Sequence, residues 1–255
     1  MAEIALITGA AGGLGQALCR RFGESGYRVI GLDRVHGPAR CEAFVEADLE
    51  NLCASPEGSA SVLERIRGPL STMTEQDGGP VKPGLAVLVN NAACQVLGPV
   101  DALSIADWQR SLCVNLLAPF LLIQGLLPEL MRARGSVINI TSVHAKVTKR
   151  GFCCYATSKA ALEGMTRSMA TELGTRIRVN AIAPAAFATP MLEAGFAGRD
   201  EARRQLGEMH PVGRIGQPEE IAECALFLAS PGAGFINGAV LRVDGGISNR
   251  LHDPL

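Results

Sequence analysis

Ile4-Ala-Leu-Ile-Thr-Gly-Ala-Ala-Gly-Gly-Leu-Gly15 is the stretch of sequence that decides the fold. It opens with an unbroken apolar run over residues 4–7, which is typical of a parallel strand covered on both faces. A glycine-rich turn follows, and then an amphipathic helical pattern that ends at Gly26. Strand, glycine turn and helix in this order predict a site where backbone N–H groups and a helix N-terminus meet a pyrophosphate. The alternative is a tight turn that binds no ligand.

The next strand is expected at residues 27–32, closing on Asp33. An acidic residue about twenty positions after the glycine turn accepts hydrogen bonds from an adenosine ribose and repels a 2′-phosphate, which favours NAD over NADP. Arg34 could bind that phosphate in a different loop conformation. A third strand is expected at 43–47, with Asp48 and Leu49 at its tip, near where an adenine would lie.

Four further strands are expected at 85–90, 135–141, 176–183 and 239–243, the third of them broken by Pro184. Helices are expected at 59–67, after an N-cap at Ser104 and at 217–229, whereas the glycines and prolines of 71–84 indicate a loop. A chain of 255 residues fits one domain with a large core. The pattern predicts an α/β fold with a parallel sheet in a single domain, residues 1–255.

Tyr155 and Lys159 stand four residues apart in a helical stretch, so their side chains share one helix face. A free tyrosine ionises at about pH 10, and a fixed ammonium beside it favours the phenolate. One lysine supplies part of the shift that a neutral-pH base needs, so we expect a second positive charge nearby. The alternative is a half-buried tyrosine beside a solvated lysine.

Polar or small residues also stand where strands end or helices bury an apolar face. Asn115 lies within the apolar face of the long helix and needs partners, either backbone groups or a water held at a cleft. Ser142 ends the fifth strand, at the edge where parallel sheets bind ligands, or else caps a turn. The Asn91-Ala-Ala93 segment lets a backbone approach a nucleotide, or is a simple strand exit. His144 could shape a substrate pocket or assist proton transfer, or be a polar loop residue.

Composition excludes several other classes. Charged residues make up 19% of the chain and the net charge is −1, so we expect no nucleic-acid partner. The eight cysteines show no paired metal-ligand spacing and no signal peptide is apparent, so we expect reduced thiols, a cytoplasmic location and no metal. The apolar stretch 112–131 contains Asn115, Pro119 and Glu129, which favours a buried or subunit-facing helix over a membrane span.

In order and spacing, these motifs resemble the compact single-domain branch of the short-chain dehydrogenase/reductase family over essentially the whole chain. The matching pieces are Thr8-Gly9-x-x-x-Gly13-x-Gly15, Asn90-Asn91-Ala92, Asn115, Ser142, Tyr155-x-x-x-Lys159 and the loop from Pro184 to Thr189-Pro190. The resemblance implies a doubly wound seven-stranded parallel sheet (Rossmann fold). It also implies a homotetramer or homodimer in which the long helices around Asn115 and Tyr155 pack across a subunit interface.

The resemblance further implies roles for individual residues. Tyr155 would exchange a proton with the substrate oxygen, Ser142 would hold that oxygen, and Lys159 would bind the nicotinamide ribose. Asn115 would anchor a water that links Lys159 to solvent. Substrate contacts are expected from Ser142, His144 and Tyr155. The expected cofactor contacts are Gly9, Gly13, Leu14, Gly15, Asp33, Asp48, Leu49, Asn91, Ala92, Ala93, Val114, Tyr155, Lys159, Pro184, Phe187 and Thr189.

The chain departs from the family pattern in several places. Ala93 and Ala185 stand where glycines are usual, and Ala185 is the riskier change if that residue needs a positive φ. Ala86 replaces the usual aspartate, and the loop before the fourth strand is long. Residues 186–211 are expected to form a lid over the substrate. The cations at 146, 149 and 150 either attract an acidic substrate or form a solvated rim.

We therefore expect an NAD(H)-dependent oxidoreductase that transfers a hydride between a small-molecule secondary alcohol or ketone and nicotinamide. One alternative is an NADPH-dependent ketoacyl or carbonyl reductase, which predicts a basic residue at Gly12 and no carboxylate at Asp33. Another is a non-catalytic nucleotide-binding scaffold. A scaffold has no need of Asn115, Ser142, Tyr155 and Lys159 together.

Overall fold

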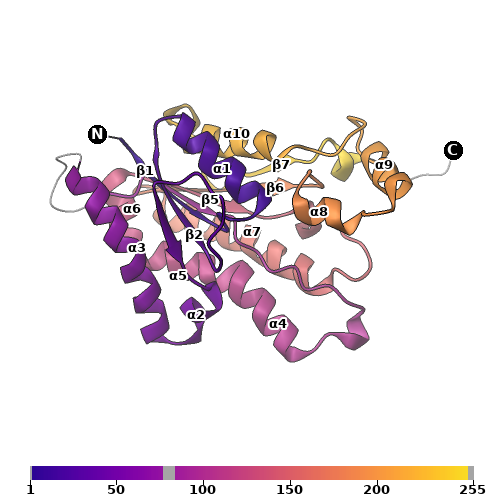
Figure 1. Ribbon diagram of the computed structural model, residues 1–255, viewed down its shortest axis with the longest axis horizontal. Helices are drawn as coiled ribbons and strands as arrows, with labels where there is room; N and C mark the ends of the chain where they lie inside the picture. Colours follow the sequence, from indigo (N-terminus) through magenta and orange to yellow (C-terminus); the bar gives the residue numbers. More distant parts are fainter. Residues whose placement is uncertain (1, 77–83, 252–255) are drawn as a thin grey trace.

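The computed structural model describes residues 2–76 and 84–251. In this part of the chain, one seven-stranded sheet has all its strands parallel, in the order β3-β2-β1-β4-β5-β6-β7 (Figure 1). The strands are β1 (Ile4–Thr8), β2 (Arg28–Asp33), β3 (Ala43–Glu46), β4 (Val87–Asn90), β5 (Ser136–Ile140), β6 (Arg178–Pro184) and β7 (Val240–Val243). The prediction of a doubly wound parallel sheet is confirmed.

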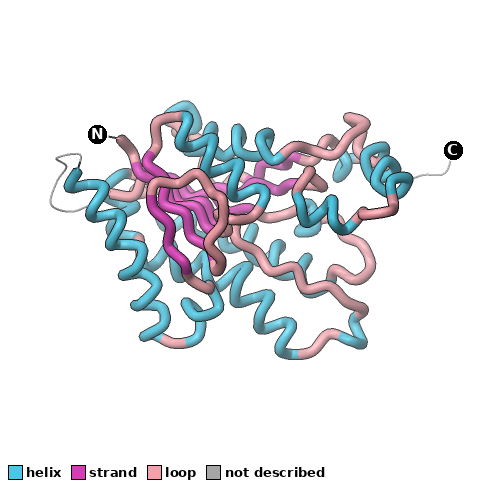
Figure 2. The backbone as a smooth tube through the Cα atoms, viewed as in Figure 1, coloured by secondary structure: helices cyan, strands magenta, loops and turns pink. Residues whose placement is uncertain are grey.

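Helices cover both faces of the sheet, which Figure 2 shows as a fan of strands between two helical layers. The α-helices are α1 (Gly13–Glu24), α2 (Leu49–Ala54), α3 (Pro56–Gln76), α4 (Ile105–Leu112), α5 (Ala118–Gly125), α6 (Leu127–Ala133), α7 (Cys153–Leu173), α8 (Pro190–Gly195), α9 (Asp200–Glu208) and α10 (Pro218–Ala229). Helices α1 and α10 lie side by side on one face, and α3, α5 and α7 lie on the other (Figure 1).

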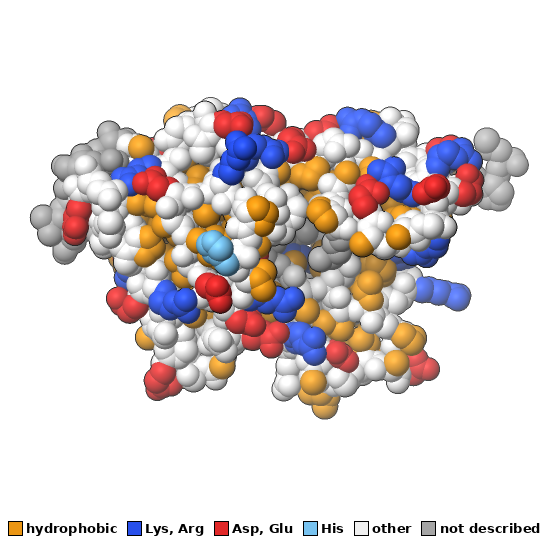
Figure 3. Space-filling model, in the orientation of Figure 1, with side chains coloured by type: hydrophobic (Ala, Val, Ile, Leu, Met, Phe, Trp, Pro, Cys, Tyr) orange, Lys and Arg blue, Asp and Glu red, His pale blue; other side chains and the backbone are white. Residues whose placement is uncertain are grey.

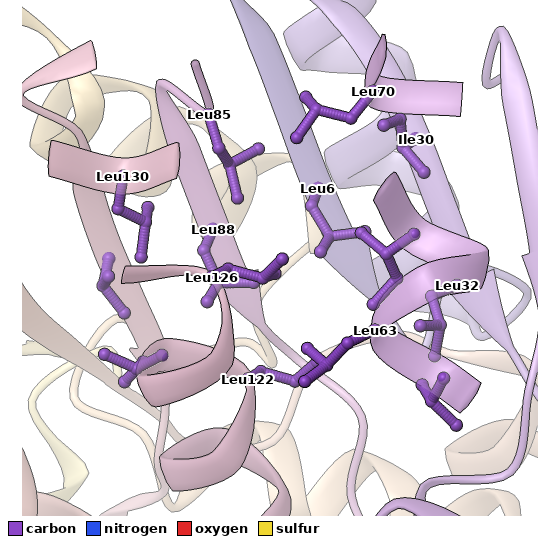
Figure 4. Close-up of a cluster of buried hydrophobic side chains, with 14 of the residues drawn as sticks. Leu6, Ile30, Leu32, Leu63, Leu70, Leu85, Leu88, Leu122, Leu126 and Leu130 are labelled. Carbon is purple, nitrogen blue, oxygen red and sulfur yellow. The ribbon is translucent and has the colours of Figure 1, made fainter. Parts of the chain in front are cut away.

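Strand β1 belongs to both cores because its side chains alternate between the two faces of the sheet. Ile4 and Leu6 lie in the cluster with α3, α5 and α7, whereas Ala5 and Ile7 lie in the cluster with α1 and α10. Figure 4 shows the first cluster, where leucines of α3 and α5 meet over the sheet. Burial on both faces explains why the strand reads as a continuous apolar run.

Helix α3 corrects the loop expected from Ser71 onward. Residues 71–76 are helical, and α3 runs through Pro69 without ending there. Leu70 and Met73 are buried against the sheet, so packing outweighs the helix-breaking tendency of the proline. Residues 77–83, the remainder of the expected loop, lie outside the described residues.

The long helix begins, as expected, with Ser104 as its N-cap. Ser104 and Asp107 form a capping box, and the helix continues from α4 through a π-helical turn, Cys113–Leu117, into α5. Within residues 2–76 and 84–251, no single helix is long and apolar enough to cross a membrane. The stretch Ile105–Gly125 reaches that length and composition only when combined with α6, from which it is bent by 63°.

The order of the strands sets where a ligand can bind. The chain leaves β1 toward β2 and β3 on one side and returns to β4 on the other, so the crevice of the sheet opens beyond the carboxyl ends of β1 and β4. The expected lid contains α8 and α9, which are joined by the ion pair of Arg203 with Glu193.

Glycine is required at Gly15 by close contact. A Cβ there would lie 1.9 Å from the Gly9 carbonyl oxygen, whereas a Cβ on Gly23 in the same helix would meet no atom within 4 Å. We expect Gly15→Ala to lower the free energy of unfolding by about 2–3 kcal/mol, because the turn must move. Gly23→Ala, the matched control, should raise it by about 0.5–1 kcal/mol. Urea unfolding measures both; equal effects would contradict the close approach.

Candidate functional site

The glycine turn is held against the end of β4 by direct contacts. Gly9 has a φ of +66°, and a Cβ on it would lie 2.8 Å from the Ala92 Cα. The Thr8 hydroxyl oxygen accepts hydrogen bonds from the N–H groups of Asn91 and Ala92, both at 3.0 Å. The Asn91 amide donates to the carbonyl oxygens of Thr8 and Gly9 at 2.9 and 3.1 Å. Asn91 therefore fixes the turn with its side chain. The small residue that follows, Ala92, lets the two backbone segments lie close together at the crevice.

The start of α1 is suited to an anion. Its N-cap residue, Gly12, forms no side-chain cap, and its first turn contains no acidic residue. The first N–H groups of a helix have no partner within the helix and carry a partial positive charge. A Cβ on Gly13 would lie 2.9 Å from Pro190 at the start of α8, so the lid begins beside this turn. These residues fit a pyrophosphate.

Asp33 ends β2 beside the glycine turn. One carboxylate oxygen accepts from the Ala11 N–H at 3.0 Å and the other from the Arg34 N–H at 2.7 Å. Each oxygen can accept further hydrogen bonds, so the carboxylate is fixed in place and can still receive hydroxyl donors. The side chain lies where a ribose beside the pyrophosphate would be bound.

The residues expected near an adenine also have structural roles. Asp48 is the N-cap of α2, where one of its oxygens accepts from the Glu50 N–H at 2.9 Å. Leu49 is buried in the core, and Val114, on the π-helical turn, is half-buried. The helix α2 was not anticipated, although Asp48 followed two positions later by Glu50 is typical of a helix start.

Tyr155 and Lys159 lie on α7 as expected, and the lysine is not solvated. Lys159 is 2% exposed, and its Nζ donates to the Ile140 carbonyl oxygen at 2.8 Å. The same Nζ lies 5.8 Å from the centroid of the Tyr155 ring. Burial lowers the pKa of Lys159 to about 8. This excludes the expectation of a tyrosine beside a solvated lysine.

The Tyr155 hydroxyl does not have the lowered pKa that the neighbouring lysine was expected to produce. Burial raises the pKa of Tyr155, and a hydrogen bond with the Ser142 side chain opposes that shift. The lysine therefore does not lower the pKa of the phenol by itself. The second positive charge expected at the site stays a prediction.

Ser142 both caps a turn and faces Tyr155. Its hydroxyl oxygen accepts from the His144 N–H at 3.2 Å, at the start of a short 3-10 helix, Val143–Ala145. Because that N–H approaches the hydroxyl oxygen, the Ser142 proton is free to point toward the Tyr155 oxygen, where a hydrogen bond stabilises negative charge. The capping alternative and the ligand-binding alternative are thus compatible.

Asn115 is fully buried on the π-helical turn and bridges backbone groups. Its amide donates to the Cys94 carbonyl oxygen at 2.8 Å and to the Ser158 hydroxyl at 2.9 Å, and its oxygen accepts from the Cys94 N–H at 2.8 Å. Ser158 donates in turn to the Tyr155 carbonyl oxygen at 2.7 Å. Both amide hydrogens are used on protein groups, which is the backbone-bridging alternative, and the water expected at Asn115 stays a prediction.

The start of the lid corrects two smaller expectations. Pro184 does not break β6 but ends it, paired with Val243. Ala185 does not have a positive φ, so an alanine there is not strained. In the described part of the chain, the non-glycine residue with a positive φ is Arg134. Phe187 pairs with Gly216, and the Thr189 hydroxyl caps α8 by accepting from the Leu192 N–H at 3.2 Å. Alanine at 185 is therefore tolerated.

The face of the molecule shown in Figure 3 is hollowed near its centre, between α8 and α4 of Figure 1. Three residues that contact members of the expected site were absent from it. Thr8 clamps the glycine turn, Ser158 links Asn115 to Tyr155, and Phe152 stacks on His144. The sequence offered one signal for them: each stands next to, or within three residues of, an expected site residue, namely Gly9, Lys159 or Tyr155.

A family model described as enoyl-(acyl carrier protein) reductase matches residues 9–248. The chain belongs to the short-chain dehydrogenase/reductase family. It is 34% identical to 3beta-hydroxysteroid dehydrogenase 1 of Eggerthella lenta, with 95% of this chain and 92% of the relative covered. It is 34% identical to a 3-oxoacyl-(acyl-carrier-protein) reductase of Vibrio cholerae, with 96% and 97% covered.

Solved structures of short-chain dehydrogenases/reductases have the same fold. An aldohexose dehydrogenase of Thermoplasma acidophilum superposes with a TM-score of 0.86 at 30% identity, covering 100% of this chain and 97% of that chain. A putative gluconate 5-dehydrogenase of Beutenbergia cavernae with bound NADP gives 0.82 at 31%, covering 97% of each. A 4-hydroxyisoleucine dehydrogenase with NADH gives 0.81 at 26%, covering 98% and 100%. The protein is thus an NAD(P)-dependent oxidoreductase acting on hydroxyl or keto groups.

The buried lysine makes stability depend on pH. The unfolded chain holds the Lys159 proton up to the ordinary lysine pKa of 10.5, whereas the folded chain releases it near pH 8. From pH 8 to 10.5, the free energy of unfolding of the wild type should rise relative to that of Lys159→Met by on the order of 1–3 kcal/mol. Urea unfolding over this range measures the difference. The cysteines also titrate here, but they are present in both proteins, so their contribution cancels in the comparison. Parallel profiles would contradict the burial of the ammonium.

Proposed function

We propose that this enzyme transfers a hydride between a secondary alcohol or ketone and nicotinamide, with NAD(H) as its preferred cofactor. The observation that carries the proposal is the buried Lys159 ammonium beside Tyr155 and Ser142, at the carboxyl edge of the sheet. A scaffold that only binds nucleotides would bear the cost of burying this charge without using it.

Tyr155 would take the hydroxyl proton of the alcohol, or return it to the ketone oxygen, through its own phenol oxygen. Ser142 would donate its proton to the substrate oxygen, where negative charge develops. Bound oxidised nicotinamide supplies the hydride acceptor and a positive charge. Lys159 uses one hydrogen of its ammonium on the Ile140 carbonyl oxygen, which leaves two for the ribose hydroxyls of the cofactor.

We infer that Asn115 is a positioning residue. Its amide ties Cys94, beyond the end of β4, to Ser158, which holds the main chain of Tyr155. The amide thereby connects the cofactor side of the crevice with the catalytic helix.

The cofactor preference is supported by Asp33. Its carboxylate is fixed beside the glycine turn and would repel a 2′-phosphate. The comparisons leave the choice open, since one similar structure contains NADH and another contains NADP. The uncharged Gly12 likewise favours NAD over the NADPH-dependent alternative.

We also propose a homotetramer or homodimer in the cytoplasm. Leu117, Phe120 and Met131 are exposed on the helices around Asn115, which suits a subunit-facing surface. All eight cysteines are free, which suits a reducing compartment.

Tyr155→Phe should lower kcat for alcohol oxidation by about 10²–10⁴-fold while NADH still binds, because only the proton-transfer group is lost. Tyr27→Phe is the matched control, since Tyr27 packs on Phe22, in the α1 core. NADH fluorescence and steady-state kinetics measure the two effects. Undiminished turnover in Tyr155→Phe would remove the proposed mechanism.

Asp33→Asn keeps an oxygen acceptor for Ala11 but removes the negative charge. We expect the ratio of the NADPH and NADH dissociation constants to shift toward NADPH by about tenfold or more, because a charged hydrogen-bond acceptor and a repulsion are both lost. Fluorescence titration gives both constants. A wild type that binds NADPH more tightly than NADH would overturn the preference.

A further inference from the structure

A stack of two rings stands next to the catalytic tyrosine. The rings of His144 and Phe152 are stacked, with their centroids 4.2 Å apart and their planes at 16°. Tyr155 lies edge-on to both, at 6.1 Å from His144 and 6.2 Å from Phe152. The two rings therefore lie face to face, and this His144–Phe152 stack, called the wall below, stands beside the phenol.

The wall is held rigidly. His144 is fixed at its backbone by Ser142 and at its ring by a hydrogen bond between Nδ1 and the Thr148 hydroxyl at 3.1 Å. Phe152 follows Gly151, which has a φ of +81° and accepts a hydrogen bond from the Gly98 N–H at 3.0 Å. That bond brings the exposed Leu97 segment beside the wall.

The wall carries no charge of its own at neutral pH. Burial, with a smaller contribution from Lys149, lowers the pKa of His144 to about 4. Lys149 is exposed, and its Nζ lies 4.8 Å from the centroid of the Phe152 ring, a cation–π contact. The cations at 146, 149 and 150 are all exposed, which fits the rim alternative.

Several charged side chains of the lid pair with one another. Arg203 is paired with Glu193, and Arg204 is paired with Glu201 and Glu208. Phe196 and Leu192 are half-buried within the lid. A sugar has several hydroxyl groups that need partners, and buried hydroxyl groups without partners are costly. Near Tyr155, the Ser142 proton would serve the reacting oxygen of the substrate, and Nδ1 of His144 is already hydrogen-bonded to Thr148.

We propose that the His144–Phe152 wall receives the body of the substrate, and that the enzyme acts on secondary alcohols with a ring or chain hydrocarbon body in preference to polyhydroxylated sugars and sugar acids. This inference rests on the proposed function, because it names the substrate class of the same site.

The first test is kinetic and compares apolar secondary alcohols (a substituted cyclohexanol, a hydroxysteroid) with glucose and gluconate, all with NAD. We expect kcat/KM to be at least about tenfold higher for the apolar alcohols, because each buried methylene group favours binding. Phe152→Ala should raise KM for them by about tenfold with a smaller change in kcat. Phe227→Ala, on the exposed face of α10, should change neither constant. Equal or better turnover of the sugars would overturn the inference.

The second test does not depend on turnover. In Tyr155→Phe with NADH bound, an apolar ketone such as a substituted cyclohexanone should change NADH fluorescence at a lower concentration than a keto sugar does. Phe152→Ala in that background should weaken the ketone response by about tenfold. If ketone binds in this way but no alcohol is oxidised by the wild type, the proposed function fails and the inferred binding preference stands. If the keto sugar binds more tightly, the inference fails.

Discussion

The buried ammonium of Lys159 is the constraint on which the site depends. A charge removed from water costs several kcal/mol unless other groups replace the lost solvation. In the described structure, the Ile140 carbonyl oxygen and the Tyr155 ring provide part of that replacement. Burial lowers the pKa of the lysine and raises the pKa of the tyrosine, so each group is destabilised in its charged form. Hydroxyl groups of a bound ligand would accept hydrogen bonds from the ammonium, and a positive charge on that ligand would stabilise the phenolate.

The sheet keeps these groups in place because it is rigid beneath them. A chain of buried hydrogen bonds runs from Asn90 of β4 to Asn139 of β5 at 2.8 Å and on to Thr166 of α7 at 2.9 Å. It ties α7 to the two strands that Asn91 and Ser142 follow. Apolar packing on both faces holds the strands in register, so the crevice beyond their carboxyl ends is largely preformed.

The sequence predicted the elements that depend on local pattern. It did not predict the features that depend on contacts between distant parts of the chain. The strand, turn and helix around Gly9 were predictable because close backbone contact leaves only glycine. The helix over residues 71–76 was mistaken for a loop, since its stability comes from burial of Met73 against the sheet. The roles of Ser158 and Phe152 were also missed, because they arise from contacts with Asn115 on another helix and with His144 on a short 3-10 helix.

The titration of Tyr155 tests the central claim most directly. The chain has two tyrosines, so in the Tyr27→Phe variant the phenolate absorbance reports Tyr155. We expect NAD⁺ to move this absorbance to lower pH than in the free protein, and Lys159→Met to remove most of the movement. A titration that NAD⁺ leaves unchanged would contradict the account.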